Sequence, residues 1–431
     1  MDEVLRFLSL ADANVRFVLA GSILLGSASG VVGVFTLLRR RSLLGDALAH
    51  AALPGVALGF MLTLSKSIVP LLIGASAAGI LGVLAITAMV KTGRIREDAA
   101  IGITLSVFFG IGIVLLTFIQ RLPSGNQSGL DKFLFGQAAA MLPQDVQLMS
   151  IVSVVTLITI TLLYKEFRLL VFDANYLAAQ GFPVTLLDIL LMFLVVLVVM
   201  IGLQAVGVVL MAALLITPAA GARFWSDDLK IMLLLAALFG AVSGVLGVFF
   251  SSLAPRIPTG PVMVLAATLL FALSAVFAPR RGLLARRMRQ IQTGRRTAQE
   301  HLLRASLEWM ELNPGAVRIP LDALAGPLGV PLSAVERTAA ALSKKGDIHF
   351  TNRNAQLTAA GKDKALAILK SHRLWEYYLL HRMALKQDHV HRDADQIEHI
   401  LSPDVIERLE KLLQEDGVDV ENITSVHPVA G

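Results

Sequence analysis

The sequence predicts an all-α polytopic membrane protein of eight or nine transmembrane helices, followed by a C-terminal cytoplasmic domain. Hydrophobic residues make up 55% of the 431 residues, and the mean hydropathy of +0.70 is well above that of ordinary soluble enzymes. Long apolar runs fill the chain up to about residue 279, whereas charged segments of mixed pattern follow. The chain has no cysteine, which excludes disulfides and thiolate metal sites.

Each apolar run is long enough to cross a bilayer, which takes about 20 helical residues. Many of the runs are rich in glycine, alanine and serine, which let helices in a membrane approach closely. Only a short gap at Leu203 and Gln204 separates two of the runs, so the total is nine spans or eight. The predicted spans are residues 15–38, 43–64, 68–90, 99–119, 143–164, 185–203, 205–224, 229–251 and 260–278.

Basic residues at the ends of these runs predict the orientation, because cytoplasmic loops carry an excess of lysine and arginine. With Arg39–Arg41 inside, 12 basic residues lie on the cytoplasmic side and six outside. This orientation makes the C-terminal domain cytoplasmic and the protein a multi-pass component of the cell's inner (plasma) membrane. The N-terminus lies outside with nine spans and inside with eight.

The change in composition divides the chain into three parts. Residues 1–279 form the predicted membrane domain, and residues 297–431 a water-soluble domain with 15 basic and 19 acidic residues, a net charge of −4. Between them, residues 280–296 form a linker with seven arginines and no acid. Such a juxtamembrane segment is suited to an anionic lipid surface.

Two ionisable residues stand inside the second apolar run. Asp46 and His50 are four residues apart, so on a helix they share one face. One interpretation is structural, with the two side chains bonding each other or a backbone carbonyl and holding helices together. The other is functional, because ionisable groups in a span often face an aqueous path, and carboxylate and imidazole are ligands of divalent transition metals. Weak coordination by few ligands suits transport, since the ion must also leave.

Five motifs stand in the membrane domain: RRRSLLGDALAHAALPGVALGF (39–60), GRIREDAAIGITLS (93–106), FDANYLAAQGFPVTLLD (172–188), GVVLMAALLITPAAGAR (207–223) and PTGPVMVLAATLLF (258–271). They resemble motifs of the ABC-3 permeases, the membrane subunits of manganese, zinc and iron importers. The resemblance implies ATP-driven import of a divalent metal by a permease dimer, either two copies or two related permeases, with an extracytoplasmic metal-binding protein. The chain has no G-x-x-x-x-G-K-[ST] phosphate loop, so we expect a separate ATPase and no catalytic site here.

The same resemblance implies a contact for the ATPase. In such permeases a short cytoplasmic helix seats in a cleft of the ATPase, and residues 173–181 are the candidate. Asp173 is expected near the N-terminal end of that helix, Gly181 at its C-terminal end, and Pro183 follows. An ordinary capped loop helix would need the same residues.

The C-terminal domain has the pattern of a winged helix-turn-helix. Residues 299–312 predict a helix, and residues 321–350 predict helix, turn, helix and short strand. Gly329 and Pro331 mark the turn. After residues 351–354, the segment from Ala355 predicts a wing strand and the start of another helix.

Residues 357–380 and 389–402 resemble the iron- and manganese-dependent repressors of the diphtheria toxin repressor type. The resemblance implies two metal sites built from nitrogen and oxygen ligands, which suit manganese, iron or zinc. His372, Glu376 and His391 correspond to one site. The second corresponds to Asp395, Glu398 and His399, completed by a first-helix residue near His301.

Whether this domain binds DNA depends on charge, because phosphate contacts dominate affinity for nucleic acids. Its net charge is negative, and the predicted recognition helix, about residues 332–345, offers only Arg337, Lys344 and Lys345. We therefore favour a metal-sensing regulatory or dimerising module. The alternative for the whole chain is a membrane-anchored, metal-responsive DNA-binding transcriptional regulator.

Overall fold

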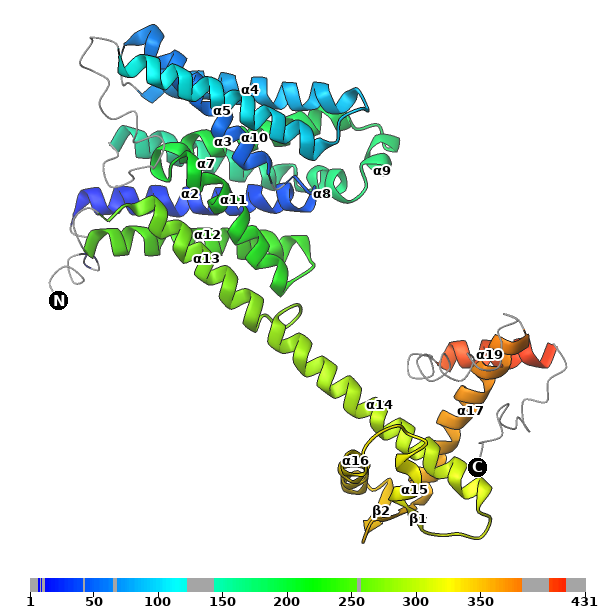
Figure 1. Cartoon of the computed structure of the whole chain (residues 1–431). Helices are drawn as coiled ribbons and strands as arrows, with labels where there is room; N and C mark the ends of the chain where they lie inside the picture. Colours follow the sequence, from blue (N-terminus) through cyan, green and yellow to red (C-terminus); the bar gives the residue numbers. More distant parts are fainter. Residues whose placement is uncertain are drawn as a thin grey trace. The chain divides into compact units, whose positions relative to one another are not determined.

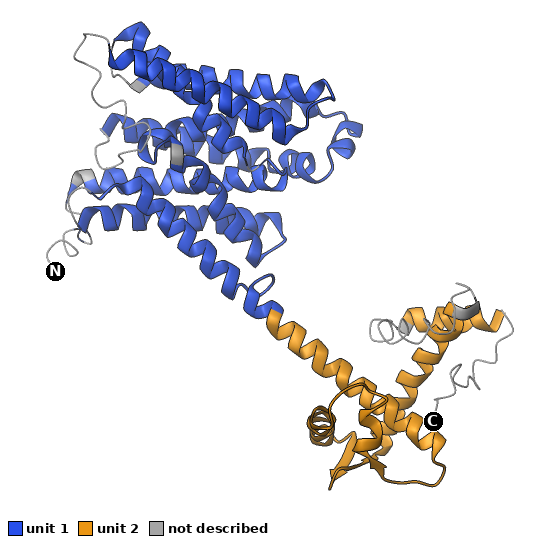
Figure 2. Cartoon of the chain, in the orientation of Figure 1, with its two compact units in different colours: residues 1–286 blue, residues 287–431 orange. Residues whose placement is uncertain are grey.

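The structure is a computed structural model of the chain. It describes residues 12–41, 43–64, 68–121, 143–253, 257–381 and 403–415, together with Phe7 and Ser9. The chain divides into two compact units, residues 1–286 and residues 287–431 (Figure 2). Each unit is described by itself.

Unit 1 is a bundle of helices (Figure 1). Within the described residues, eight helices are long and apolar enough to cross a membrane, and α11 is a shorter apolar helix. This confirms the predicted all-α polytopic class. The helices are α2 Ala13–Leu38, α3 Leu44–Thr63, α4 Ile68–Lys91, α5 Glu97–Gln120, α7 Pro143–Leu162, α8 Tyr164–Phe172, α9 Ala174–Ala179, α10 Val184–Ala205, α11 Val208–Trp225, α12 Leu229–Leu253 and α13 Thr259–Phe277.

The segment around Leu203 and Gln204 forms two helices. α10 continues through both residues to Ala205, and α11 begins at Val208. Gly207 separates the helices with a φ of 93°, a backbone conformation that L side chains rarely adopt. The break between the two helices therefore lies among buried residues, from Ala205 to Val208.

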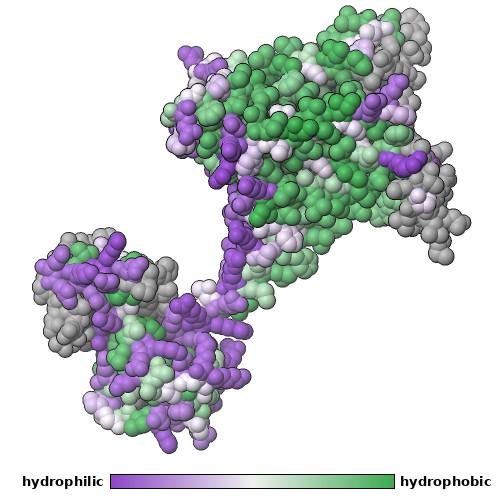
Figure 3. All heavy atoms as spheres, turned by 180° about the vertical axis from the view of Figure 1, so that it is seen from behind, coloured by the Kyte–Doolittle hydropathy of each residue, from purple (hydrophilic) through white to green (hydrophobic). Residues whose placement is uncertain are grey.

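Close helix packing in unit 1 depends on glycine. α2 makes its most extensive contact with α12. At Gly26 and Gly240 the two backbones meet so closely that a Cβ on either residue would collide with the carbonyl of the other. α3, by contrast, is buried along nearly its whole length between α4, α5 and α11. Figure 3 shows a broad hydrophobic surface over unit 1, as lipid contact requires.

Unit 2 contains most of α14 Leu283–Leu312, and then a small mixed domain. The segment predicted as a linker, residues 280–296, is helical from Leu283 onward, because its arginine, leucine, methionine and glutamine are good helix formers. The remaining elements are β1 Ile319–Pro320, α15 Leu321–Ala325, α16 Leu332–Lys344, β2 Ile348–Thr351, β3 Asn354–Leu357, α17 Ala359–His381 and α19 Pro403–Glu415.

The sheet of unit 2 is antiparallel, with strand order β1-β3-β2. Asn352 and Arg353, with φ values of 49° and 61°, form the tight turn between β2 and β3, as a two-residue hairpin requires. Thr358 then accepts a hydrogen bond from the Gly361 N–H at 3.1 Å and caps α17. Along the chain, α15 and α16 thus precede a two-stranded hairpin and α17, and β1, which the sequence did not predict, joins the hairpin as a third strand.

The glycine contact between α2 and α12 leads to a test. We expect Gly26→Ala to destabilise unit 1 by about 1–3 kcal/mol, because the added methyl group overpacks two backbones that cannot separate freely. Gly110→Ala, in open space on α5, is the matched control. Thermal unfolding of the purified protein in detergent measures both. Equal melting temperatures for the two variants would contradict the packing argument.

Candidate functional site

The candidate transport site begins at the turn between α2 and α3. Arg40 has a φ of 60°, and the Arg41 N–H donates to the Thr36 carbonyl at 2.9 Å. These features end α2 in a left-handed C-terminal turn. The N–H of Leu44, the first residue of α3, donates back to the Arg41 carbonyl at 3.0 Å. The backbone of Arg41 is therefore attached to the first turn of α3.

Asp46 and His50 lie in the first two turns of α3, as their spacing predicts. His50 Nε2 is 3.4 Å from Asp46 Oδ1, and the two side chains are 16% and 36% exposed. The imidazole also packs edge-to-face on the ring of Phe109 in α5, with ring centroids 4.8 Å apart. Its Nδ1 atom is buried and has no hydrogen-bond partner among the described residues.

The pair offers one nitrogen and one carboxylate to a divalent cation. Both ligand types suit manganese, zinc and iron. Within the described residues no group of three or more histidine, aspartate or glutamate side chains is placed to hold a metal.

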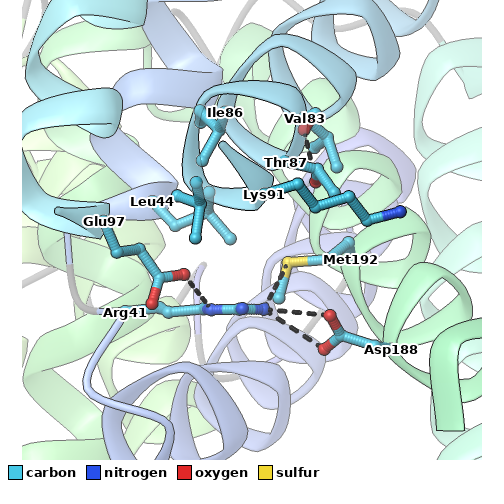
Figure 4. Close-up of a pocket in the computed structure, with 10 residues that line it drawn as sticks. Arg41, Leu44, Val83, Ile86, Thr87, Lys91, Glu97, Asp188 and Met192 are labelled. Carbon is cyan, nitrogen blue, oxygen red and sulfur yellow. Dashed lines mark hydrogen bonds and ion pairs between the residues drawn. The ribbon is translucent and has the colours of Figure 1, made fainter. Parts of the chain in front are cut away.

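A cluster of four charged side chains lies beside this turn, and we name it the arginine junction: Arg39, Arg41, Glu97 and Asp188. Arg41 Nη1 is 3.2 Å and 3.3 Å from the two carboxylate oxygens of Asp188, and Arg39 Nη1 is 2.9 Å from the same group. Arg41 Nε pairs with Glu97, in the first turn of α5. Figure 4 shows the Arg41 side chain lying between the two acids.

The arginine junction is partly buried, and its four side chains are between 18% and 35% exposed. A cavity of about 90 Å³ adjoins it, lined also by Val83, Ile86 and Thr87 of α4. Burial lowers the pKa of the Arg39 guanidinium, and the negative charge of Asp188 counteracts this effect.

Sequence reasoning did not identify this junction. Arg39–Arg41 served there as a sign of orientation and as the start of one motif, and Glu97 and Asp188 both stand inside other motifs of the membrane domain. The signal that could have found them is an acid at the start of an apolar span, because such a charge needs a partner when it is partly buried.

The candidate contact for the ATPase, residues 173–181, contains the short helix α9. Asp173 Oδ1 accepts a hydrogen bond from the Tyr176 N–H at 2.9 Å and caps the helix. Gly181, with a φ of 85°, follows its C-terminal end, and Pro183 directly precedes α10. Leu177 is fully buried, whereas Tyr176 is half-exposed. α9 is therefore anchored on one side and open on the other.

In unit 2, two of the predicted regulatory ligands meet in the interior. His372 Nε2 is 3.0 Å from Glu376 Oε1, and the side chains are only 2% and 1% exposed. A guanidinium nitrogen of Arg304, on α14, lies 2.7 Å from His372 Nδ1. The donor chemistry of the pair fits manganese, iron or zinc. Arg304 contacts His372 Nδ1, so a cation would have to be held by His372 Nε2, the ring nitrogen that faces Glu376.

The other predicted ligands are not brought to this pair by the described residues. His301 is on α14 and lines a different cavity, of about 220 Å³, together with Leu328 and Val335. His391, Asp395, Glu398 and His399 lie outside the described residues. Arg337, Lys344 and Lys345 of the predicted recognition helix are exposed at or next to α16.

Unit 1 is a bundle of helices long enough to span a membrane. One span carries an ionisable pair, and a short capped helix lies between two other spans. These features define a polytopic membrane permease. Residues 11–278, more than half of the chain, match the ABC 3 transport family. The chain therefore belongs to that family. Residues 358–420 match a second family, the metal binding and dimerisation domain of iron dependent repressors.

Individual relatives agree with this assignment. The chain is 43% identical to the manganese transport system membrane protein MntC of Bacillus subtilis, over 95% of this chain and 93% of that protein. It is 44% identical to the zinc transport system membrane protein TroC of Treponema pallidum, over 66% and 95%. Among solved structures, PsaBC from Streptococcus pneumoniae in complex with Fab matches with a TM-score of 0.58 and 35% identity, over 66% of this chain and 99% of that chain.

The buried cluster in unit 2 leads to a stability test. We expect Glu376→Ala to destabilise unit 2 by about 3–5 kcal/mol, because it removes the carboxylate that neutralises the interior around His372 and Arg304. Glu407→Ala, which breaks an exposed pair with Lys411, is the control and should change little. Denaturant unfolding in a Trp225→Phe background, followed by the fluorescence of the other two tryptophans in unit 2, measures both. Equal midpoints would disprove a stabilising role for the cluster.

Proposed function

We propose that this chain is the permease subunit of an ATP-binding-cassette importer for a divalent transition metal, namely manganese, zinc or iron. The observation that carries the proposal is the contact between Asp46 and His50 in a helix that is buried on nearly all sides. The names of the two relatives, one a manganese and one a zinc transport protein, support a metal as substrate.

Asp46 and His50 bind the metal ion transiently on its path through the membrane. A second copy of this chain, or a related permease, contributes further ligands at the shared axis. Each ligand replaces part of the hydration shell, and the small number of ligands allows release. An extracytoplasmic metal-binding protein delivers the ion, and a separate ATPase supplies the energy.

The ATPase binds at α9. The half-exposed Tyr176 and the exposed Phe182 offer apolar contact area beside this capped helix. This assignment puts α9 and the C-terminal domain in the cytoplasm of a cell whose inner membrane holds unit 1. The basic residues at the ends of the spans support the same orientation.

The C-terminal domain is a winged helix-turn-helix joined to a metal-sensing module that regulates transport. Metal that accumulates in the cytoplasm loads the site of His372, Glu376 and His391, and the site of Asp395, Glu398 and His399. Metal loading shifts the transporter toward its resting state. This shift requires that the resting and the active states bind the regulatory metal with different affinity. The net charge of −4 in residues 297–431 supports this role over DNA binding.

The transport site is tested by uptake. We expect Asp46→Ala and His50→Ala each to reduce uptake of the cognate metal to background, because each removes one of the two ligands offered by the chain. Vesicles that contain the chain and its ATPase are assayed with radioactive manganese, zinc and iron in turn. Asp98→Ala and His349→Ala, both at exposed positions, are the controls. Normal uptake by well-inserted Asp46 and His50 variants would refute the site.

Regulation is tested with a variant of the second metal site. We expect Glu398→Ala/His399→Ala to bind fewer Mn²⁺ ions per chain and to continue import when internal metal is high. Electron paramagnetic resonance of free Mn²⁺ counts the bound ions, and uptake into metal-preloaded vesicles measures the inhibition. If internal metal inhibits the variant as strongly as the parent chain, these residues are not the sensor.

A further inference from the structure

We propose that Arg41 is a positioning residue that carries movement of the ATPase-binding helix to the Asp46–His50 pair, through its ion pairs with Asp188 and Glu97. This inference rests on the proposed transport function. It assigns a role to the arginine junction, which no part of the proposed function requires.

The first link joins α9 to Asp188. The Leu187 N–H donates to the Pro183 carbonyl at 3.1 Å, and α10 continues without a break from Val184. Asp188 therefore belongs to the second turn of a helix that begins directly after the α9 segment. A force on α9 reaches Asp188 through a short, hydrogen-bonded stretch of backbone.

The second link joins Asp188 to the α2–α3 turn. One carboxylate contacts two guanidinium groups, with three nitrogen–oxygen distances of 2.9–3.3 Å. Partly buried ion pairs are stronger and less screened than exposed ones. The turn itself is well defined, because Arg40 adopts a left-handed conformation and the N–H of Arg41 is bonded to Thr36. Movement of the start of α10 therefore acts directly on the start of α3.

The third link reaches the candidate metal pair from two sides. Through its backbone, Arg41 contacts the first residue of α3, the helix that carries Asp46 and His50. Through Nε it pairs with Glu97 on α5, the helix whose Phe109 ring packs against His50. One guanidinium thus connects α10 with both helices that surround the imidazole.

A guanidinium can make this connection and an ammonium group cannot. Arg41 uses Nε for Glu97 and Nη1 for Asp188, so two acids on different helices are held in fixed directions. Lysine keeps the charge but presents it as a single point on a flexible chain. Arg41→Lys therefore distinguishes a role that depends on the geometry of the guanidinium from a role that depends only on its positive charge.

The test measures uptake and ATP hydrolysis in the same vesicles, with the full chain assembled with its ATPase. We expect Arg41→Lys, Glu97→Gln and Asp188→Asn to lower the metal transported per ATP by about tenfold or more, within the usual range of coupling energies, while hydrolysis continues. Arg40→Lys and Asp98→Asn are matched controls, since both residues are exposed neighbours outside the junction. An unchanged ratio in all three junction variants would overturn the proposal. Parallel loss of hydrolysis and assembly would also overturn it, because that result indicates a structural role only.

A second measurement follows the distance between the end of α9 and the start of α3. The native chain has no cysteine, so spin labels at Leu43→Cys and Gln180→Cys report on this pair alone. We expect their distance to stay constant between the nucleotide-free and ATP-bound states of the parent chain, and to change between those states in Asp188→Asn. The same distances in parent and variant would contradict the link. The distance measurement does not require transport. If the parent chain moved no metal, the proposed transport function would be refuted, whereas the role of the arginine junction would still be judged by the distances.

Discussion

A guanidinium shared by two carboxylates is the constraint on which the arrangement of unit 1 depends. Arg41, at the boundary between two apolar spans, cannot be left without partners when it is partly buried, and Asp188 and Glu97 supply them from two other helices. The pairing fixes the starts of α3, α5 and α10 relative to one another. Glycine contacts, such as that of Gly26 with Gly240, then bring other helices together where no charge directs them.

Unit 2 also buries charged side chains. Its core of leucine, isoleucine and valine lies around α15, α16 and the small sheet. Arg304, His372 and Glu376 are nevertheless buried beside it. Glu376 pairs there with His372, and Arg304 contacts the other ring nitrogen of His372, so these ionisable side chains are buried as a group, as they are in the arginine junction of unit 1.

The sequence was most informative where local patterns decide the structure. Apolar run length predicted the spans, and the turn residues Gly329 and Pro331 predicted the break between α15 and α16 in unit 2. It was least informative where residues far apart meet. Arg41 and Asp188 are separated by 147 positions, and no local pattern identifies which acid meets which base. The basic segment of residues 280–296 stays a predicted linker, and its helical conformation from Leu283 onward was not part of that prediction. Of the candidate site, the helical spacing of Asp46 and His50 was predictable, but the contact with Phe109 was not.

The partial burial of the arginine junction has a consequence for the ionic conditions under which the protein works. At physiological ionic strength the Debye length is about 8 Å, and exposed pairs such as Arg96–Asp98, whose side chains are 90% and 70% exposed, weaken as salt rises. Mobile ions reach the shared guanidinium less easily, since low-dielectric helices enclose it. The ion pairs of the arginine junction therefore depend less on the ionic strength of the surrounding solution than exposed pairs do.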